Sequence, residues 1–320
     1  MRSSCTLTHC RPPDKVSAPR VAILLSTYNG AQHVTGQLAS LRGQTLPGWR
    51  LYWRDDGSSD ATPALMRAFI DELGAGRVVV LPGEGRVGAT ESFLRLLRAA
   101  ASDNDIVCFC DQDDIWLPHK LEHGVSALHQ IAGDIPALYC ARQVLVDEEL
   151  RRIGLSPVVH RVPSFPAPLA QNIATGCTLM LNRRAAQLVA TSRAPASAFH
   201  DWWCYLLVSA GGGEIRFDAR PVVLYRQHGE NAVGAPATLL RRGVAALRRG
   251  PRPFATLLRQ HVAALLDQPQ LLSPSARAQL NAIADALGGG KLRRLAVLPH
   301  GLNRQTWPET LLFRLWFVLA

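Results

Sequence analysis

The sequence predicts an α/β fold in which helices cover both faces of a mainly parallel sheet. Short apolar runs alternate with segments of helical spacing over the first 110 residues. This alternation is typical of parallel sheets, because parallel strands need long crossover connections. The chain has 320 residues and is 48% hydrophobic, which is enough to bury one substantial core with a smaller appendage.

The first apolar run, residues 21–26 (VAILLS), is continuous and has the length of a strand that is buried on both faces. A helical pattern follows at Val34, Leu38 and Leu41. The same two signals repeat down the chain, so that strands and helices alternate as far as a fourth strand. The further strands are expected at residues 51–54, 78–81 and 106–110, and the intervening helices at 62–73 and 90–101.

The later elements are less regular. A stretch rich in proline precedes residues 172–181, which we predict as another strand. Residues 202–208 have an apolar pattern that predicts a helix, and residues 221–226 (PVVLYR) predict a final strand of the core.

Polar residues follow three of these strands at their carboxyl ends. They are residues 26–30 (STYNG) after the first strand, 55–60 (DDGSSD) after the second and 111–114 (DQDD) after the fourth. Right-handed crossovers bring the carboxyl ends of parallel strands to one edge, where open α/β sheets bind ligands. Carboxylates at such an edge suit Mg²⁺ or Mn²⁺, which in turn bridges phosphate oxygens. We therefore predict a divalent metal and a phosphorylated ligand at this rim.

Each acidic motif also has a purely structural interpretation. Asp60 could cap the next helix, and Asp114 or Asp201 could cap the helices expected after them. A cap needs only one oxygen, so capping leaves the adjacent carboxylates Asp55 and Asp56 unexplained, as well as the three acids of the DQDD motif. The mutual repulsion of these groups favours nearby donors or a cation.

Together with two later segments, these motifs resemble family 2 glycosyltransferases of the GT-A fold. The likeness is closest to the rhamnosyltransferase-like members that build bacterial O-antigen, capsule or exopolysaccharide chains. It covers about residues 20–235 and depends on five blocks in the right order. The blocks are STYNG (26–30), DDGSSD (55–60), DQDD followed by IWLPHK (111–120), HDWW (200–203) and YRQHGENAVG (225–234).

This resemblance implies transfer of a sugar, with inversion, from a donor that carries thymidine or uridine diphosphate. It also implies a Mg²⁺ or Mn²⁺ cofactor at the DXD-type motif. Arg86 stands where relatives usually carry an asparagine before a glycine, and it either binds phosphate or is solvated. The implied donor-binding residues are Thr27, Tyr28, Asn29, Asp55, Asp56, Gly57, Arg86 and Asp111, and the implied metal ligands are Asp111, Asp113 and His228.

The same resemblance makes Asp201 the general base that takes the proton from the acceptor hydroxyl. A position at the N-terminus of a helix keeps such a carboxylate ionised, as a base requires. A second tier of candidate residues lies within or beside the same motifs. It comprises Asp114, Lys120, Trp202, Trp203 and Arg226.

Positive charge is concentrated in the last 85 residues. Residues 236–320 contain 12 Lys and Arg against 3 Asp and Glu, whereas the rest of the chain contains 23 against 22. Such asymmetry indicates an anionic partner, either nucleic acid or an acidic bilayer. A helical extension packed on the core, with its arginines in solvent, would also explain it. We favour bilayer attachment through residues 311–320, because Phe313, Trp316 and Phe317 lie among leucines rather than between basic residues.

No segment predicts export or a membrane span. The N-terminal 20 residues lack the apolar stretch of a signal peptide, no window reaches roughly 18 apolar residues, and the seven cysteines form no CxxC pair. We therefore expect a cytoplasmic enzyme held peripherally at the inner face of a bacterial plasma membrane, where a lipid-linked glycan acceptor is found. The expected regions are a tail at 1–20, a catalytic domain at 21–235 and a basic helical extension at 236–320.

Two other functions fit parts of the pattern. A sugar-nucleotide pyrophosphorylase is also an α/β enzyme with acidic metal ligands, but it would need a glycine-rich phosphate loop at residues 27–29. A catalytically inactive nucleotide-binding protein that docks on membranes would fit the fold and the tail. The acidic set Asp111, Asp113 and Asp201 argues against such decay. A nucleic acid partner is not expected.

Overall fold

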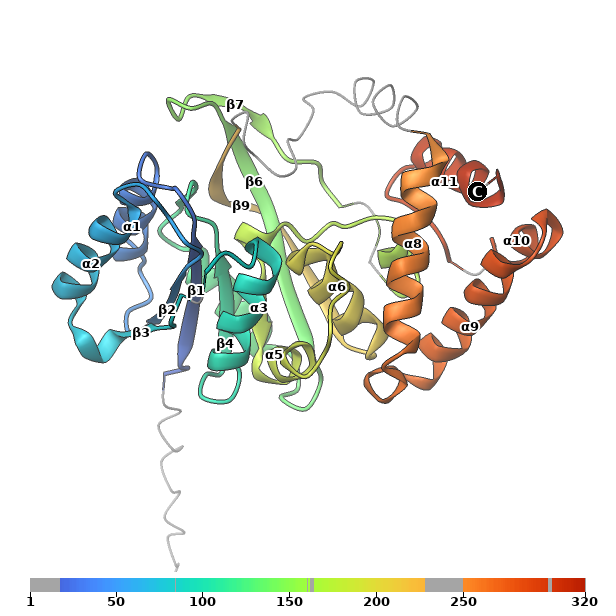
Figure 1. The fold of residues 1–320 in the computed structure, drawn as a ribbon, viewed down its shortest axis with the longest axis horizontal. Coiled ribbons are helices and arrows are strands. Elements are labelled where there is room, and N and C mark those ends of the chain that lie inside the picture. Colours follow the sequence, from blue (N-terminus) through green and yellow to red (C-terminus); the bar gives the residue numbers. More distant parts are fainter. Residues whose placement is uncertain are drawn as a thin grey trace, which may run out of the picture.

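The computed structural model describes residues 18–83, 85–159, 161, 164–227, 250–298 and 301–319. Its centre is a mixed nine-stranded sheet with the order β3-β2-β1-β4-β8-β6-β9-β5, in which β7 pairs with β6 (Figure 1). The strands are β1 (Val21–Thr27), β2 (Arg50–Asp55), β3 (Val78–Val80), β4 (Ile106–Cys110), β5 (Ile115–Trp116), β6 (Ala137–Val146), β7 (Arg152–Leu155), β8 (Met180–Asn182) and β9 (Glu214–Arg226).

Helices cover both faces of this sheet, as expected from the alternating apolar runs. The helices are α1 (Val34–Arg42), α2 (Thr62–Leu73), α3 (Ala89–Ala100), α4 (Lys120–His129), α5 (Arg183–Ala190), α6 (His200–Ala210), α8 (Pro251–Leu266), α9 (Pro274–Gly288), α10 (Lys291–Val297) and α11 (Trp307–Leu319), with short 3₁₀ turns η1 (Ala75–Arg77), η2 (Ala167–Leu169), η3 (Gly176–Thr178) and η4 (Pro269–Leu271).

The first four strands form the predicted parallel half. Strand β1 pairs with β2 and β4, and β2 pairs with β3, all in parallel. Side chains of β1 alternate between two cores, because successive side chains of a strand point to opposite faces. Ala22 and Leu24 pack in the cluster that contains α3, whereas Ile23 and Leu25 pack in the cluster that contains α1 and α2. The carboxyl ends of β1, β2 and β4 therefore meet at one edge.

The second half of the sheet differs from the prediction, because it contains antiparallel strands. Strand β8 runs antiparallel to both β4 and β6, and β5 runs antiparallel to β9. Of the strand expected at residues 172–181, only the part within β8 has strand conformation. Residues 176–178 form the 3₁₀ turn η3 instead. Residues 221–226 form only the last part of β9. The predicted α/β sheet is thus present, with parallel ladders that include β6 and β9, and with antiparallel pairing at β5, β7 and β8.

The segment after the DQDD motif is a strand and not the start of a helix. Ile115 and Trp116 pair with Leu224 and Val223 of β9, and the next helix, α4, begins at Lys120. The helix-cap interpretation of Asp114 is therefore wrong.

The helices after residue 250 pack against the sheet side that carries α3 and α6, and lie at one end of the molecule (Figure 1). Their buried side chains share one core cluster with those of α3 and α6; examples are Phe93, Leu207, Leu258, Val262, Leu280, Ile283, Phe313 and Phe317. The expected helical extension is present, while the boundary expected at 235/236 and most of the 1–20 tail lie outside the described residues. Within the described ranges, no helix has the length and apolarity that crossing a bilayer requires.

Candidate active site

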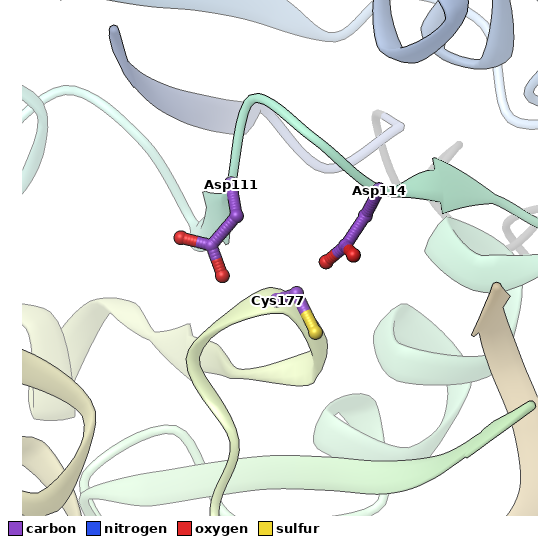
Figure 2. A group of neighbouring side chains, drawn as sticks. All are labelled: Asp111, Asp114 and Cys177. Atoms are coloured by element: carbon purple, nitrogen blue, oxygen red, sulfur yellow. The ribbon is translucent and has the colours of Figure 1, made fainter. Parts of the chain in front are cut away.

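The acidic DQDD motif forms the connection between β4 and β5, at the edge where the parallel strands end. Asp111 follows β4 directly and Asp114 directly precedes β5. Both face Cys177 of η3, and one possible ligand atom from each of the three lies within 4.8 Å of the others (Figure 2). Two carboxylates from one short loop therefore converge with a thiol from a distant segment.

Burial and mutual repulsion make ionisation of these carboxyl groups unfavourable. Burial, together with the charges of Asp113 and Asp201, raises the pKa of Asp111 to about 8. Burial and the charges of Asp113 and Asp111 raise the pKa of Asp114 well above its usual range. A bound cation would offset both effects, because an opposite charge favours the ionised form.

Asp114 also has unused capacity to bind a ligand. Its Oδ1 accepts a hydrogen bond from the backbone N–H of Arg226 at 3.1 Å. Its Oδ2 is buried and has no hydrogen-bond partner among the described residues. Buried acceptors are normally satisfied, so this oxygen fits a position beside a cation.

The chemistry of the three groups suits a hard cation held by oxygen. Mg²⁺ and Mn²⁺ prefer carboxylate ligands over thiols. Burial and the charges of Asp114 and Asp111 raise the pKa of the Cys177 thiol well above its usual range, so this group stays protonated and serves as a wall of the site. The predicted ligand Asp113 is not part of this group, although its charge acts on Asp111 and Asp114. His228 lies outside the described residues.

Two basic residues of the second tier support the acidic loop from within the protein. Lys120 is completely buried, and its Nζ lies 3.7 Å from the ring centroid of Trp116. Burial lowers the pKa of Lys120, while the charge of Asp114 acts to raise it. Arg226 donates from Nε to the backbone oxygen of Asp113 at 2.9 Å. Arg226 thus holds the loop by a hydrogen bond, whereas Lys120 is buried beside Trp116 and acts on Asp114 through its charge.

Asp201 lies in the first turn of α6, whose first residue is His200. The cap position is Phe199, without a side-chain cap bond, so Asp201 is not the N-cap. Its Oδ1 accepts from the backbone N–H of Trp202 at 2.5 Å, and its Oδ2 accepts from that of Gly176 at 3.1 Å. Burial raises the pKa of Asp201 to about 6, against the lowering effect of hydrogen bonds from Trp202, Gly176 and Asn172. The group is ionised at neutral pH and still basic enough to accept a proton.

Gly176 brings the acidic loop and α6 together, and sequence reasoning did not identify it. A Cβ on Gly176 would lie 2.8 Å from Nε2 of His200 and 3.7 Å from Oδ2 of Asp111. The His200 ring packs against both Phe93 and Phe109 in tilted contacts, with ring centroids 4.2 Å and 5.2 Å away. Burial lowers the pKa of His200 to about 3, so the imidazole is neutral. The HDWW block contains His200, but nothing in the sequence marks Gly176 or Cys177.

Thr27 and Asp55 connect the ends of β1 and β2. Thr27 is completely buried, and its hydroxyl donates to Oδ1 of Asp55 at 2.8 Å while it accepts from Nε1 of Trp53 at 3.0 Å. Oδ2 of Asp55 accepts from the backbone N–H groups of Gly57 and Ser58, at 3.1 Å and 2.7 Å. These contacts give Thr27 and Asp55 a part in shaping the rim, and their contact with a nucleotide stays a prediction.

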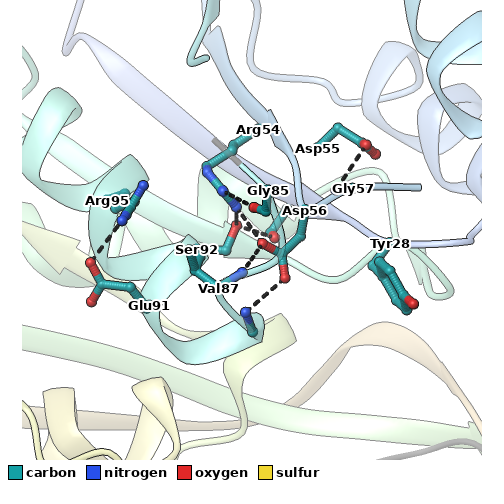
Figure 3. A network of polar contacts seen from close by, with 12 residues as sticks. Tyr28, Arg54, Asp55, Asp56, Gly57, Gly85, Val87, Glu91, Ser92 and Arg95 are labelled. Carbon is teal, nitrogen blue, oxygen red and sulfur yellow. Dashed lines mark hydrogen bonds and ion pairs between the residues drawn. The ribbon is translucent and has the colours of Figure 1, made fainter. Parts of the chain in front are cut away.

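Asp56 forms a buried ion pair beside this rim. Its Oδ1 lies 2.6 Å from Nη1 of the completely buried Arg54, and its carboxylate accepts from the backbone N–H groups of Val87 and Gly88, each at 2.8 Å (Figure 3). Burial alone would raise the pKa of Asp56, but these hydrogen bonds and the Arg54 charge lower it overall. The donors expected beside the Asp55–Asp56 dipeptide are therefore protein groups, and Asp56 holds the loop that carries Arg86.

Tyr28, Asn29 and Arg86 form the accessible part of the rim. The guanidinium carbon of Arg86 lies 4.1 Å from the centroid of the Tyr28 ring. The side chain of Gln112 accepts from the N–H of Tyr28 at 2.9 Å and donates to its carbonyl at 3.0 Å, so the acidic loop fixes the end of β1. Asn29 adopts a left-handed φ of 46° and accepts from the N–H of Ser59 at 2.8 Å. The predicted residues Tyr28, Asn29 and Arg86 are thus brought together.

The two tryptophans of the HDWW block do not face the acidic loop. Trp203 is completely buried in the core and donates from its indole to Ser192 at 2.8 Å. Trp202 donates to the backbone oxygen of Pro168 at 2.7 Å and packs edge-to-face on His261. The structure therefore assigns Trp203 to the core, and Trp202 to the contact between α6 and α8.

Comparisons with known proteins find related glycosyltransferases. Residues 22–186 match the family model described as "Glycosyl transferase family 2". The dTDP-rhamnosyl transferase RfbG of Shigella flexneri is 26% identical over 226 residues, which cover 66% of this chain and 74% of that protein. The UDP-Glc:alpha-D-GlcNAc-diphosphoundecaprenol beta-1,3-glucosyltransferase WfgD of Escherichia coli is 28% identical over 171 residues, which cover 51% of this chain and 60% of that protein.

A solved structure shares the arrangement of the sheet and helices. The crystal structure of S. aureus TarS 1–349 in complex with UDP-GlcNAc aligns with a TM-score of 0.58 and 13% identity, covering 92% of this chain and 79% of that one. At this identity the likeness shows the fold alone, and the fold is of the GT-A type.

Proposed function

Because this chain belongs to glycosyl transferase family 2, we propose that it is an inverting, metal-dependent enzyme that transfers a sugar from a nucleoside diphosphate to a hydroxyl of a growing bacterial surface glycan. The observation that carries this proposal is the placement of Asp111 and Asp201 on either side of Gly176. Asp111 belongs to the acidic loop, and Asp201 to the first turn of α6. A donor site and a base for the acceptor would thus adjoin each other.

At the donor end, Asp111 and Asp114 would hold Mg²⁺ or Mn²⁺. Asp113 and His228 remain proposed as further ligands. The bound cation would supply charge neutralisation for the departing nucleoside diphosphate. The accessible groups Tyr28 and Asn29 would bind the nucleoside, and Arg86 is placed beside Tyr28 to reach a phosphate. The buried ion pair of Asp56 would keep this part of the rim in place.

At the acceptor end, Asp201 would accept the proton of the attacking hydroxyl. Its two backbone hydrogen bonds leave other lone pairs of the carboxylate for a substrate. The elevated pKa of about 6 gives it more basicity than an ordinary aspartate while it stays ionised at neutral pH. Attack from the side opposite the leaving group would invert the anomeric carbon.

The donor and acceptor classes are proposed from the relatives. One relative is named as a dTDP-rhamnosyl transferase and another as a glucosyltransferase that uses UDP-Glc on a diphosphoundecaprenol-linked sugar. We therefore propose a dTDP- or UDP-linked donor, with rhamnose as the first sugar to test, and a lipid-linked glycan acceptor.

The decisive experiment is a panel of nucleotide sugars assayed for nucleoside diphosphate release with a polyprenyl-diphosphate sugar as acceptor. We expect release from a dTDP- or UDP-sugar that requires Mn²⁺ or Mg²⁺ and stops with EDTA. Nuclear magnetic resonance of the product would show inversion of the anomeric centre. Formation of inorganic pyrophosphate would instead identify a pyrophosphorylase, and failure to bind any nucleotide with metal would contradict the proposal.

A further inference from the structure

Helix α11 exposes a continuous row of apolar side chains. Trp307, Leu311, Leu315 and Leu319 are 69%, 58%, 52% and 52% exposed. Residues spaced by four lie on one side of a helix, so these side chains form a single stripe. The opposite side of the helix is apolar too, but it is packed into the core. A helix of this kind is expected where a second apolar medium covers the outer stripe.

Helix α10 presents exposed apolar and basic residues together. Leu292 and Leu295 are 83% and 49% exposed, and Lys291 and Arg293 are exposed beside them. Arg294 links the two helices, because its Nη1 donates to the backbone oxygen of Val318 in α11 at 3.4 Å. The exposed residues of α10 and α11 therefore belong to two helices that pack against each other. We call them the α10–α11 surface: Lys291, Leu292, Arg293, Leu295, Trp307, Leu311, Leu315 and Leu319.

The side chains expected from the sequence to attach to a bilayer are not the exposed ones. Phe313 and Phe317 are buried, 2% and 0% exposed, and stack on each other with ring centroids 6.4 Å apart. Trp316 packs towards Phe254 of α8, with ring centroids 6.3 Å apart. These aromatic side chains pack α11 against the rest of the protein. The leucine stripe on the other side of the helix therefore faces solvent.

We propose that the α10–α11 surface binds an anionic lipid bilayer, with the apolar stripe of α11 in the acyl–headgroup boundary and the basic residues of α10 at the headgroups. A 13-residue helix is ~20 Å long, which is too short to cross a hydrocarbon core of about 30 Å. It has the size and the one-sided exposure of a helix that lies in the plane of the interface.

Charge favours a bilayer over a second copy of the chain as the occupant. A symmetric dimer would place this surface against itself, and none of the eight residues that define it is acidic, so Lys291 and Arg293 would meet no opposite charge there. An acidic headgroup layer offers those residues opposite charge, at about 1 kcal/mol for each basic residue near such a surface. The basic excess of the last 85 residues acts in the same direction.

Lipid binding by this surface does not depend on the donor chemistry. Its purpose rests on the proposed function, because binding to the bilayer would bring the active site to lipid-linked acceptors. The test uses the full chain and vesicles of phosphatidylglycerol with phosphatidylethanolamine, against vesicles of phosphatidylcholine. We expect flotation with the anionic vesicles only, weakened by 0.5 M salt. The triple variant Leu311→Ser, Leu315→Ser and Leu319→Ser should bind on the order of 1,000-fold more weakly, because each leucine in the acyl region contributes roughly tenfold.

Ile153→Ser is the matched control, because Ile153 is an apolar residue, 56% exposed, on β7. It should bind vesicles like the wild type. Nucleotide binding by both variants, measured by calorimetry, should equal that of the wild type, so that loss of lipid binding is distinguished from loss of the donor site. Wild-type protein that does not float, a triple variant that floats unchanged, or a dimer abolished by the triple variant would each overturn the proposal.

Discussion

The backbone N–H of Gly176 donates to Oδ2 of Asp201 at 3.1 Å, and Oδ2 of Asp111 lies in van der Waals reach of the same residue, 3.7 Å from the position that a Cβ on Gly176 would take. A residue of the η3 turn thus fixes the distance between the acidic loop after β4 and the first turn of α6. The relationship joins the two halves of the proposed reaction, since one carboxylate serves the donor and the other the acceptor.

Replacement of Asp201 by asparagine should abolish most sugar transfer without unfolding the protein. The expected loss in kcat is ~10²- to 10⁴-fold, the usual contribution of general-base assistance. Asparagine accepts only one of the two backbone hydrogen bonds, so a stability loss of about 1 kcal/mol is expected. Donor affinity measured by calorimetry should stay within about twofold. An Asp201→Asn variant with wild-type transfer would remove this residue from the role of base.

The pH dependence of transfer should report the pKa of Asp201. A base must be ionised, and burial raises the pKa of this group to about 6, so kcat/KM should fall as the pH drops through 6 and be about tenfold below its plateau at pH 5. The measurement needs saturating Mn²⁺, because a bound cation keeps the metal carboxylates ionised. The residual rate of the Asp201→Asn variant should lack this fall in kcat/KM at acidic pH. If the variant shows the same fall in kcat/KM at acidic pH, the titrating group is a residue other than Asp201.

Replacement of Asp111 by asparagine should stabilise the metal-free protein while it destroys metal binding. The pKa of Asp111 is raised in the folded state, so its ionisation opposes folding as the pH rises through neutrality. Removing that charge should raise Tm at pH 8 by ~2–4 °C. Manganese with uridine or thymidine diphosphate should raise the Tm of the wild type and not that of the variant. The exposed control Asp103→Asn should behave like the wild type, and a variant that still responds to metal would contradict the ligand assignment.

Replacement of Gly176 by alanine should reduce transfer more than it reduces stability. The added Cβ would lie 2.8 Å from Nε2 of His200, so the imidazole and the adjoining Asp201 must shift. A displacement of about 1 Å at a reacting group costs up to ~10²-fold in rate, and we expect a kcat at least tenfold lower. The control is Gly133→Ala, where no atom lies within 4 Å of an added Cβ. Equal rates for the two variants would show that the turn does not position the base.

The parallel half of the fold was predictable because it has strong local signals. Strands β1 and β4 are continuous apolar runs, and the apolar residues of α3 recur with helical spacing on its buried face. The second half of the sheet, in which β6 and β9 are parallel but β5 and β8 run antiparallel, was not predictable in this detail. Strands β5 and β8 have two and three residues and pair with segments far away in the chain. Such short strands form because neighbouring strands supply their partners, which no local pattern records.

The candidate site shows the same division between local motifs and distant contacts. The motifs located Asp111 and Asp201, the two carboxylates to which we assign the proposed chemistry. They did not reveal that Cys177 and Gly176 face these acids, because that meeting depends on the turn before β8. The motifs also did not show that Asp55 and Asp56 have different roles. Only the structure shows that Asp56 forms a buried ion pair with Arg54.

The buried pair of Arg54 and Asp56 yields the last prediction, which concerns stability. Arg54→Met should lower the free energy of unfolding by ~3–5 kcal/mol, because it leaves a carboxylate buried without its counter-charge. Since the pKa of Asp56 is lowered in the folded state, this difference should be present at neutral pH and shrink as the pH falls through that lowered pKa. Urea unfolding at pH 7 measures it. Arg42→Met, which breaks the exposed pair with Glu72, is the control and should cost less than about 1 kcal/mol. Equal losses of unfolding free energy in the two variants would mean that the buried pair does not stabilise the rim.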